Sequence, residues 1–177
     1  MMQTRKAPRL QGYDYSQRGA YFVTICAADK QSLFGTMRIS AVGADAHIGP
    51  LLEHPSAAEG KAHVAPYVEL TPIGEIVEKY LRSVPGMEKY VVMPDHVHFL
   101  VSIADGPMWA SAPTTVAVVM SLPKLVRSFK TLSTKAAGRP LWQRGYYDHI
   151  IRDENDFLRC WRYIDENPAR WEDRRED

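Results

Sequence analysis

Runs of β-branched and aromatic residues, set off by glycine and proline, predict the strands of this chain. Residues 20–27 (AYFVTICA) form the clearest run and predict a buried strand, and residues 33–40 are expected to pair with it. A bend at Pro94-Asp95 divides a second extended stretch. The other extended runs are 68–71, 90–93, 96–103 and 142–151.

Apolar residues at helical spacing predict three helices. Thr71 is an N-cap candidate, with Pro72 at the first helical position. A second helix begins near Pro123. A third is capped by Asp153 and is expected to end before Pro168. The apolar stripes are Ile73, Ile76, Val77, Tyr80 and Val84; Leu122, Leu125, Val126, Phe129 and Leu132; and Phe157, Cys160, Trp161 and Ile164.

The order of these elements predicts an α+β fold. A βαββαβ core with an antiparallel sheet and helices on one face is the ferredoxin-like split βαβ layout, to which the C-terminal helix is added. We expect the other sheet face to be free for a ligand. The chain contains no internal repeat, and its 177 residues fit a single domain over 1–177. Residues 41–66 lack a sustained period and predict a surface excursion.

Composition excludes several classes of protein. Hydrophobic residues make up 45% and charged residues 24% of the chain, which is typical of a globular protein and excludes wholesale disorder. The first ten residues lack the apolar region of a signal peptide, and the longest apolar run, 116–120, is too short to span a membrane. Cys26 and Cys160 fall in strand and helix segments, which favours a reducing compartment. We therefore expect a cytoplasmic protein without a membrane partner.

Basic residues are concentrated in one part of the chain, although the net charge is only +1. Between Ser121 and Arg152, seven lysines and arginines stand against Asp148 alone. This excess favours contacts with phosphates, while a solvated helix face is the alternative. The candidates for DNA binding are Lys124, Arg127, Lys130, Arg139 and Arg144. Candidates for stacking on an unpaired base, with a core role as the alternative, are Trp142, Tyr146 and Tyr147.

His96-Val97-His98 is the first candidate for chemistry. Alternate residues of a strand share a face, so both imidazoles point to the side opposite the apolar residues of this run. Two imidazoles on one exposed face can converge on a metal ion and leave coordination positions open for substrate oxygens. The alternative is a pair of polar residues on a solvated face.

Tyr163 and Asn167 form the second candidate. Tyr163 lies a quarter-turn or more from the centre of the apolar stripe of the last helix, so packing does not require it. Asn167, four residues on, lies on the same side. The alternative is a surface tyrosine and an ordinary asparagine before a proline.

Together these residues suggest a phosphoryl-transfer reaction. A phenol is a weak nucleophile near neutral pH and needs an activated electrophile. A divalent ion bound by His96 and His98, with the Asn167 carbonyl oxygen as third ligand, could activate a phosphodiester for attack by Tyr163. The product would be a phosphotyrosine, which stores the energy of the phosphodiester and allows rejoining without ATP.

Several segments resemble a known family. The run Tyr90–Leu100 (YVVMPDHVHFL) resembles the histidine–hydrophobic–histidine strand of the HUH single-strand endonucleases. Residues 146–153 (YYDHIIRD) and 163–168 (YIDENP) look like the segments that follow that strand in the REP-associated tyrosine transposases. The N-terminal runs 12–15 and 19–25 also look like that group, so the resemblance covers most of the chain apart from 41–66 and the ends.

The resemblance implies a site and a substrate. His96 and His98 would bind a divalent ion, Mg²⁺ or Mn²⁺, and Tyr163 would be the nucleophile. Asn167 stands where relatives place a polar metal ligand, which in some is the longer glutamine. The substrate would be single-stranded DNA beside a hairpin or palindromic repeat, cleaved and rejoined by this transposase or nickase through a 5′-phosphotyrosine. Related transposases form dimers whose tyrosine helix serves its own or a neighbour's site, and a homodimer stays open here.

Three points stay open at this level. His149 either lies near the site or makes a hydrogen bond at the edge of its strand, and we favour the second. A non-catalytic nucleic-acid-binding module on a ferredoxin-like sheet would use His96 and His98 as contacts. A metal-dependent phosphodiesterase would activate water in place of Tyr163.

Overall fold

The computed structural model of the protein describes residues 12–40, 65–103 and 121–173. Most of the surface excursion predicted at 41–66 therefore lies outside the described residues. Within the described ranges, no helix combines the length and the apolar character needed to cross a bilayer. The elements are β1 (Gly19–Cys26), η1 (Ala28–Lys30), β2 (Gly35–Ser40), β3 (Ala65–Leu70), α1 (Pro72–Arg82), β4 (Met87–Val92), β5 (His96–Ile103), α2 (Leu122–Ala137), β6 (Tyr147–Ile150) and α3 (Glu154–Asp173).

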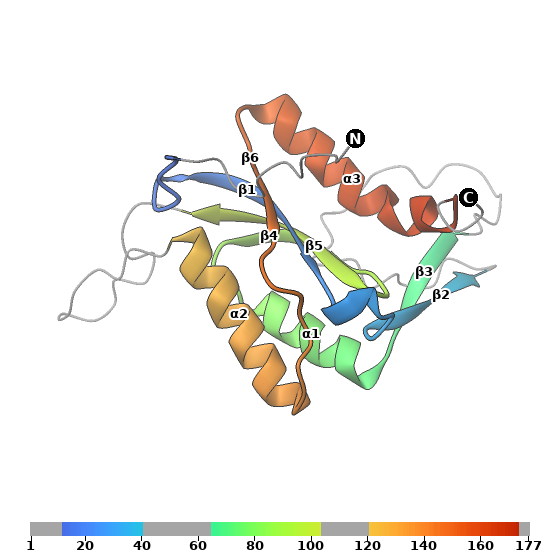
Figure 1. Ribbon diagram of the computed structural model, residues 1–177. Coiled ribbons are helices and arrows are strands. Elements are labelled where there is room, and N and C mark those ends of the chain that lie inside the picture. Colours follow the sequence, from blue (N-terminus) through green and yellow to red (C-terminus); the bar gives the residue numbers. More distant parts are fainter. Residues whose placement is uncertain (1–11, 41–64, 104–120, 174–177) are drawn as a thin grey trace, which may run out of the picture.

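A four-stranded antiparallel sheet organises the molecule. Its strands lie in the order β4-β5-β1-β6, and the chain visits β1, α1, β4, β5, α2 and β6 in turn. This is the βαββαβ arrangement, so the predicted ferredoxin-like fold is confirmed. Helices α1 and α2 lie together on one side of the sheet, and α3 lies on the other (Figure 1).

Strands β2 and β3, which lie between β1 and α1 in the sequence, form a separate two-stranded sheet. The prediction that residues 33–40 pair with the first strand is wrong. Both edges of β1 are already hydrogen-bonded, to β5 on one side and to β6 on the other. A strand has only two edges, so β2 pairs with the next available strand along the chain.

Both faces of the main sheet are buried. On one face, Val23, Ile25 and Phe99 pack in a core with α1 and α2. On the other, Leu100 and Ile164 belong to a second core built with α3. The expectation of a free sheet face is therefore wrong, because the apolar stripe of α3 is itself buried against that face.

Helix α3 begins where the sequence predicts but runs further. The Asp153 carboxylate accepts a hydrogen bond of 2.8 Å from the Asp156 amide, so it caps the helix as predicted. The predicted end before Pro168 is wrong, because α3 continues to Asp173 with Pro168 inside it. Proline removes one amide donor, but Pro168 is buried and Trp171 in the next turn packs against the second core, which favours continuation of the helix.

Strand β6 is shorter than the predicted run 142–151. Only Tyr147–Ile150 is a strand, and Trp142 makes an isolated bridge to Ala27. Gly145, with a φ of 86°, separates the two. A left-handed backbone at this position suits glycine and interrupts the extended conformation.

Candidate functional site

The two histidines of β5 face each other beneath α3. In the β1–β5 register, His98 lies opposite Thr24 and His96 opposite Cys26. The two Nε2 atoms are 2.9 Å apart. The side is the predicted one, but it is not exposed: His96 is 8% and His98 5% accessible, because α3 covers them.

Each imidazole is held through its other nitrogen. His98 Nδ1 lies 2.7 Å from the Thr24 hydroxyl, and His96 Nδ1 lies 2.5 Å from an Asp95 carboxylate oxygen. An ionised carboxylate can only accept, so His96 Nδ1 is the donor in this contact. Metal-binding histidines are commonly oriented by partners of this kind.

Tyr163 of α3 reaches this pair. Its ring lies edge-on to His98, with centroids 5.2 Å apart and planes at 76°. Phe22 of β1 supports the same ring at 5.7 Å. The Arg170 guanidinium, which pairs with the Glu166 carboxylate, lies 5.8 Å from the Tyr163 ring centroid. The fold thus brings together residues that lie 65 positions apart in the sequence.

Asn167 lies one turn beyond Tyr163 and is completely buried. Neither its carbonyl oxygen nor its amide nitrogen has a hydrogen-bond partner. The same holds for the buried indole nitrogen of Trp171, whose ring lies 5.4 Å from that of His96. A buried amide without partners costs about 1–3 kcal/mol, so a bound group or an ordered water would stabilise Asn167.

These donors fit a divalent ion. Two nitrogens bound at about 2.1 Å to one ion at a right angle lie about 3.0 Å apart, close to the 2.9 Å between His96 and His98 Nε2. The unpaired Asn167 oxygen is a ligand type that Mg²⁺ and Mn²⁺ accept. The roles of the three residues as ligands stay a prediction.

The predicted DNA-binding residues do not join this cluster. Lys124, Arg127 and Lys130 lie on α2, on the other side of the sheet, and Arg139 and Arg144 lie between α2 and β6. The Lys130 ammonium donates to the carbonyl oxygens of Gln143 and Gly145, at 2.6 and 3.1 Å. Burial lowers the pKa of Lys130. The other four side chains are exposed, and their contact with DNA stays a prediction.

The three candidates for base stacking differ in how far their rings are buried. Trp142 packs against Phe129, and its indole nitrogen donates to the Ser133 hydroxyl at 3.0 Å, whereas Tyr146 is only 9% accessible. Both therefore belong to the core. Tyr147 is 61% accessible and lies opposite Thr24, in the cross-strand row that contains His98. Of the three, only Tyr147 offers an open ring on the side of the histidine pair.

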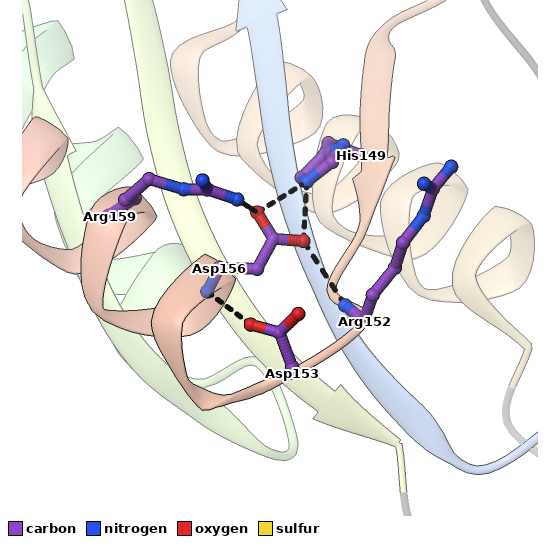
Figure 2. A network of polar contacts seen from close by, with 5 residues as sticks. All are labelled: His149, Arg152, Asp153, Asp156 and Arg159. Atoms are coloured by element: carbon purple, nitrogen blue, oxygen red, sulfur yellow. Dashed lines mark hydrogen bonds and ion pairs between the residues drawn. The ribbon is translucent and has the colours of Figure 1, made fainter.

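His149 makes the hydrogen bond at the strand edge that we favoured. Its Nε2 lies 3.0 and 2.9 Å from the two carboxylate oxygens of Asp156, which also accept from the Arg152 amide and the Arg159 guanidinium (Figure 2). Ligand atoms of His149, Asp156 and Cys160 lie within 4.8 Å of one another. The Asp156 oxygens are already saturated by donors, one of them cationic, so we assign no metal to this group.

The Asp156 carboxyl makes stability depend on pH. Its burial raises the pKa, but hydrogen bonds from His149, Arg152 and Arg159 outweigh this and lower the pKa to about 2. A lowered pKa stabilises the fold above pH 4, and this contribution, about 2 kcal/mol, is lost as the pH falls toward 2. Urea unfolding should show the stability gap between wild type and Asp156→Asn narrowing by about 1 kcal/mol from pH 6 to pH 3. A constant gap would contradict the assignment.

The sequence prediction lacks several residues of the site, among them Asp95, Thr24 and Trp171. Asp95 directly precedes His96, so its position was a usable signal. Thr24 could be found only from the β1–β5 register, which the sequence does not specify. Trp171 lies beyond Pro168, where the helix was expected to have ended.

The fold and the candidate site match a layout that the sequence predicts. A ferredoxin-like sheet with two imidazoles on a central strand, crossed by a helix that sets a tyrosine beside them, has the layout expected of HUH single-tyrosine transposases. No family model matches the chain.

Two relatives and one solved structure are similar to the chain. The chain is 28% identical over 188 residues to an uncharacterised protein of Haemophilus influenzae, covering 95% of this chain and 90% of that protein. It is 30% identical over 82 residues to a "Putative REP-associated tyrosine transposase" of the same organism, 45% of this chain and 47% of that protein. A REP-associated tyrosine transposase bound to a REP hairpin shares the fold, with a TM-score of 0.52 and 18% identity over 96% of this chain and 74% of that one. The resemblance to REP-associated tyrosine transposases is thereby confirmed.

Proposed function

We propose that the protein is a metal-dependent transposase or nickase that cleaves and rejoins single-stranded, hairpin-bearing DNA through a 5′-phosphotyrosine. The observation that carries the proposal is the Tyr163 ring edge-on to His98, 5.2 Å away, on a helix from a distant part of the sequence. The hairpin in the complex of the structural neighbour supports the choice of substrate. A DNA substrate also favours the cytoplasm as the place of action.

His96, His98 and Asn167 would hold Mg²⁺ or Mn²⁺. Such an ion would polarise the phosphodiester and neutralise charge that develops on its oxygens. Asp95 and Thr24 hold the two imidazoles through Nδ1, so both Nε2 atoms stay in place. Burial beneath α3 shields the two imidazoles from most of the solvent, which would strengthen electrostatic interactions there.

Tyr163 would supply the nucleophile. Its phenol oxygen bonds to phosphorus as the bond to the 3′ oxygen breaks, and the proton lost by the phenol is balanced by one taken up at the 3′ oxygen. Attack of a 3′-hydroxyl on the phosphotyrosine reverses these steps and rejoins the strand. The Arg170 guanidinium near the phenol would favour a phosphate at this position.

Covalent capture tests the proposal. Wild-type protein is incubated with a labelled strand carrying a hairpin, with Mn²⁺, with Mg²⁺ or with a chelator, and is then denatured. We expect a labelled protein–DNA adduct and a free 3′-hydroxyl fragment in equal amounts, and neither with the chelator.

The two alternatives give other results in the same assay. A phosphodiesterase that activates water yields fragments in the presence of metal without any adduct. A binding module yields neither, and its affinity for DNA falls with salt and is indifferent to metal. Either outcome would overturn the proposed function.

Tyr147 provides a test of substrate binding. Stacking of a base on an aromatic ring contributes about 1–3 kcal/mol, so Tyr147→Ala should raise the Kd for single-stranded DNA at least about fivefold. Fluorescence anisotropy at fixed salt measures the change. Leu132→Ala is the control, because Leu132 is also exposed, at 45%, but lies on α2 across the sheet. Equal affinities of both variants would exclude stacking at Tyr147.

A further inference from the structure

Two ion pairs tie α3 to the two opposite edges of the main sheet. In the strand order β4-β5-β1-β6, the edges are β6 and β4. His149 of β6 bonds to Asp156 in the first turn of α3, and Lys89 of β4 bonds to Asp165, nine residues further along. Helix α3 runs across the sheet face between these points (Figure 1).

The β6 pair is a convergent network. Four hydrogen bonds reach the Asp156 carboxylate, two from His149 Nε2 and one each from the Arg152 amide and Arg159 (Figure 2). The Asp156 side chain is only 7% accessible, whereas that of His149 is 48% accessible. Because the carboxylate is buried and multiply bonded, it fixes the start of α3 against β6.

In the β4 pair, the cation is the buried partner. Lys89 Nζ lies 2.6 Å from an Asp165 carboxylate oxygen, with the Lys89 side chain 9% accessible. The same ammonium lies 4.1 Å from the ring centroid of Trp161, one turn earlier on α3. A buried ammonium needs these partners, so Lys89 holds this stretch of the helix close to β4.

The two pairs lie on opposite flanks of the helix. At about 100° per residue, Asp156 and Asp165 project about 180° apart. Because the two ion pairs hold opposite flanks of α3, rotation of the helix about its axis in either direction would stretch both of them. Tyr163 lies seven residues after Asp156, within about 20° of the same direction, and so shares the flank that β6 holds. The ring on that flank is the one that meets His98 and Phe22.

We propose that His149–Asp156 and Lys89–Asp165 are positioning pairs that set the rotation of α3 and thereby hold the Tyr163 hydroxyl at the histidine site. This inference rests on the proposed function for its effect on rate. A shift of about 1 Å at a reacting group can cost about a hundredfold in rate, whereas it costs little in substrate affinity. Loss of either pair therefore lowers the maximal rate more than the affinity for DNA.

Adduct formation over a range of DNA concentrations tests the inference, below the unfolding temperature of every variant. His149→Ala should lower the maximal rate about 10- to 100-fold and leave the half-saturating DNA concentration within about twofold. His149→Gln keeps an N–H donor and should restore the rate. Lys89→Met, which keeps the packing on Trp161, should lower the rate as His149→Ala does.

An ion pair that includes no residue of α3 is the control. Arg38 and Glu69 join β2 to β3 at 2.7 Å, and Glu69→Gln should leave the rate unchanged. Rates within twofold of wild type in both His149→Ala and Lys89→Met would overturn the inference, as would an equal loss in Glu69→Gln.

A second measurement does not depend on activity. Nuclear Overhauser contacts between the ring protons of Tyr163 and those of His98 and Phe22 should be present in wild type and lost or weakened in His149→Ala and Lys89→Met. Contacts of undiminished strength would also overturn the inference. A failure of the proposed function can be told apart from a failure of this inference, because wild-type protein itself would then form no adduct.

Discussion

Tyr163→Phe should abolish the covalent adduct, lowering its rate of formation at least about a thousandfold. The variant removes one oxygen and keeps the ring that packs edge-on against His98 and Phe22. The fold and the affinity for hairpin DNA should therefore stay within about twofold of wild type. Single-turnover capture with Mn²⁺, read on a denaturing gel, measures the loss, and anisotropy measures binding.

A second tyrosine serves as the matched control for this substitution. Tyr147 is exposed on the same side of the sheet, so Tyr147→Phe removes a phenol oxygen of equal chemistry and keeps a ring for stacking. It should form the adduct at the wild-type rate. An adduct of full yield in Tyr163→Phe would remove this residue from the nucleophile's role and direct attention to another side chain.

His98→Ala should weaken Mn²⁺ binding by more than about a hundredfold and abolish adduct formation at metal concentrations that saturate wild type. The reason is geometric: His98 Nε2 lies 2.9 Å from that of His96, and its loss leaves one imidazole nitrogen where two converge. Titration calorimetry measures the affinity for the ion in the absence of DNA. Thr24→Ala, which loses only the hydroxyl at Nδ1, should give a smaller loss of about 10- to 100-fold.

His149→Gln controls for the loss of one histidine from the protein. It replaces an imidazole that faces Asp156 and keeps a donor there, so the affinity for Mn²⁺ should match wild type. Wild-type affinity in His98→Ala would contradict the metal site at β5, and an equal loss in His149→Gln would place the ion elsewhere.

Much of the fold followed from local pattern. The apolar stripe of α1 and its Thr71–Pro72 start are local signals, and the Thr71 side chain accepts from the Gly74 amide as an N-cap should. Strand pairing was harder, because residues 33–40 have no feature that excludes β1 as a partner. Only the pairing of β1 with both β5 and β6 decides it, and that is a property of the whole sheet.

Chemistry at the site was easier to predict than its surroundings. The alternation of β5 placed His96 and His98 on one side, and helical spacing placed Tyr163 with Asn167, before any tertiary contact was considered. Their burial was missed, because nothing local says that α3 lies across this face. The local rule that a proline ends a helix predicted an end before Pro168. Tertiary packing of Trp171, in the following turn, overrides that rule.

The small β2–β3 sheet has a consequence for how the chain can vary in length. Ser40 and Ala65, which flank residues 41–64, lie directly opposite each other in the ladder. The backbone thus leaves and rejoins the fold at two neighbouring points, and the entropic cost of closing a loop there grows only slowly with its length. Residues could be gained or lost at this tip without displacing β5 or α3, so the length of the chain can change here while the histidine pair and Tyr163 stay in place.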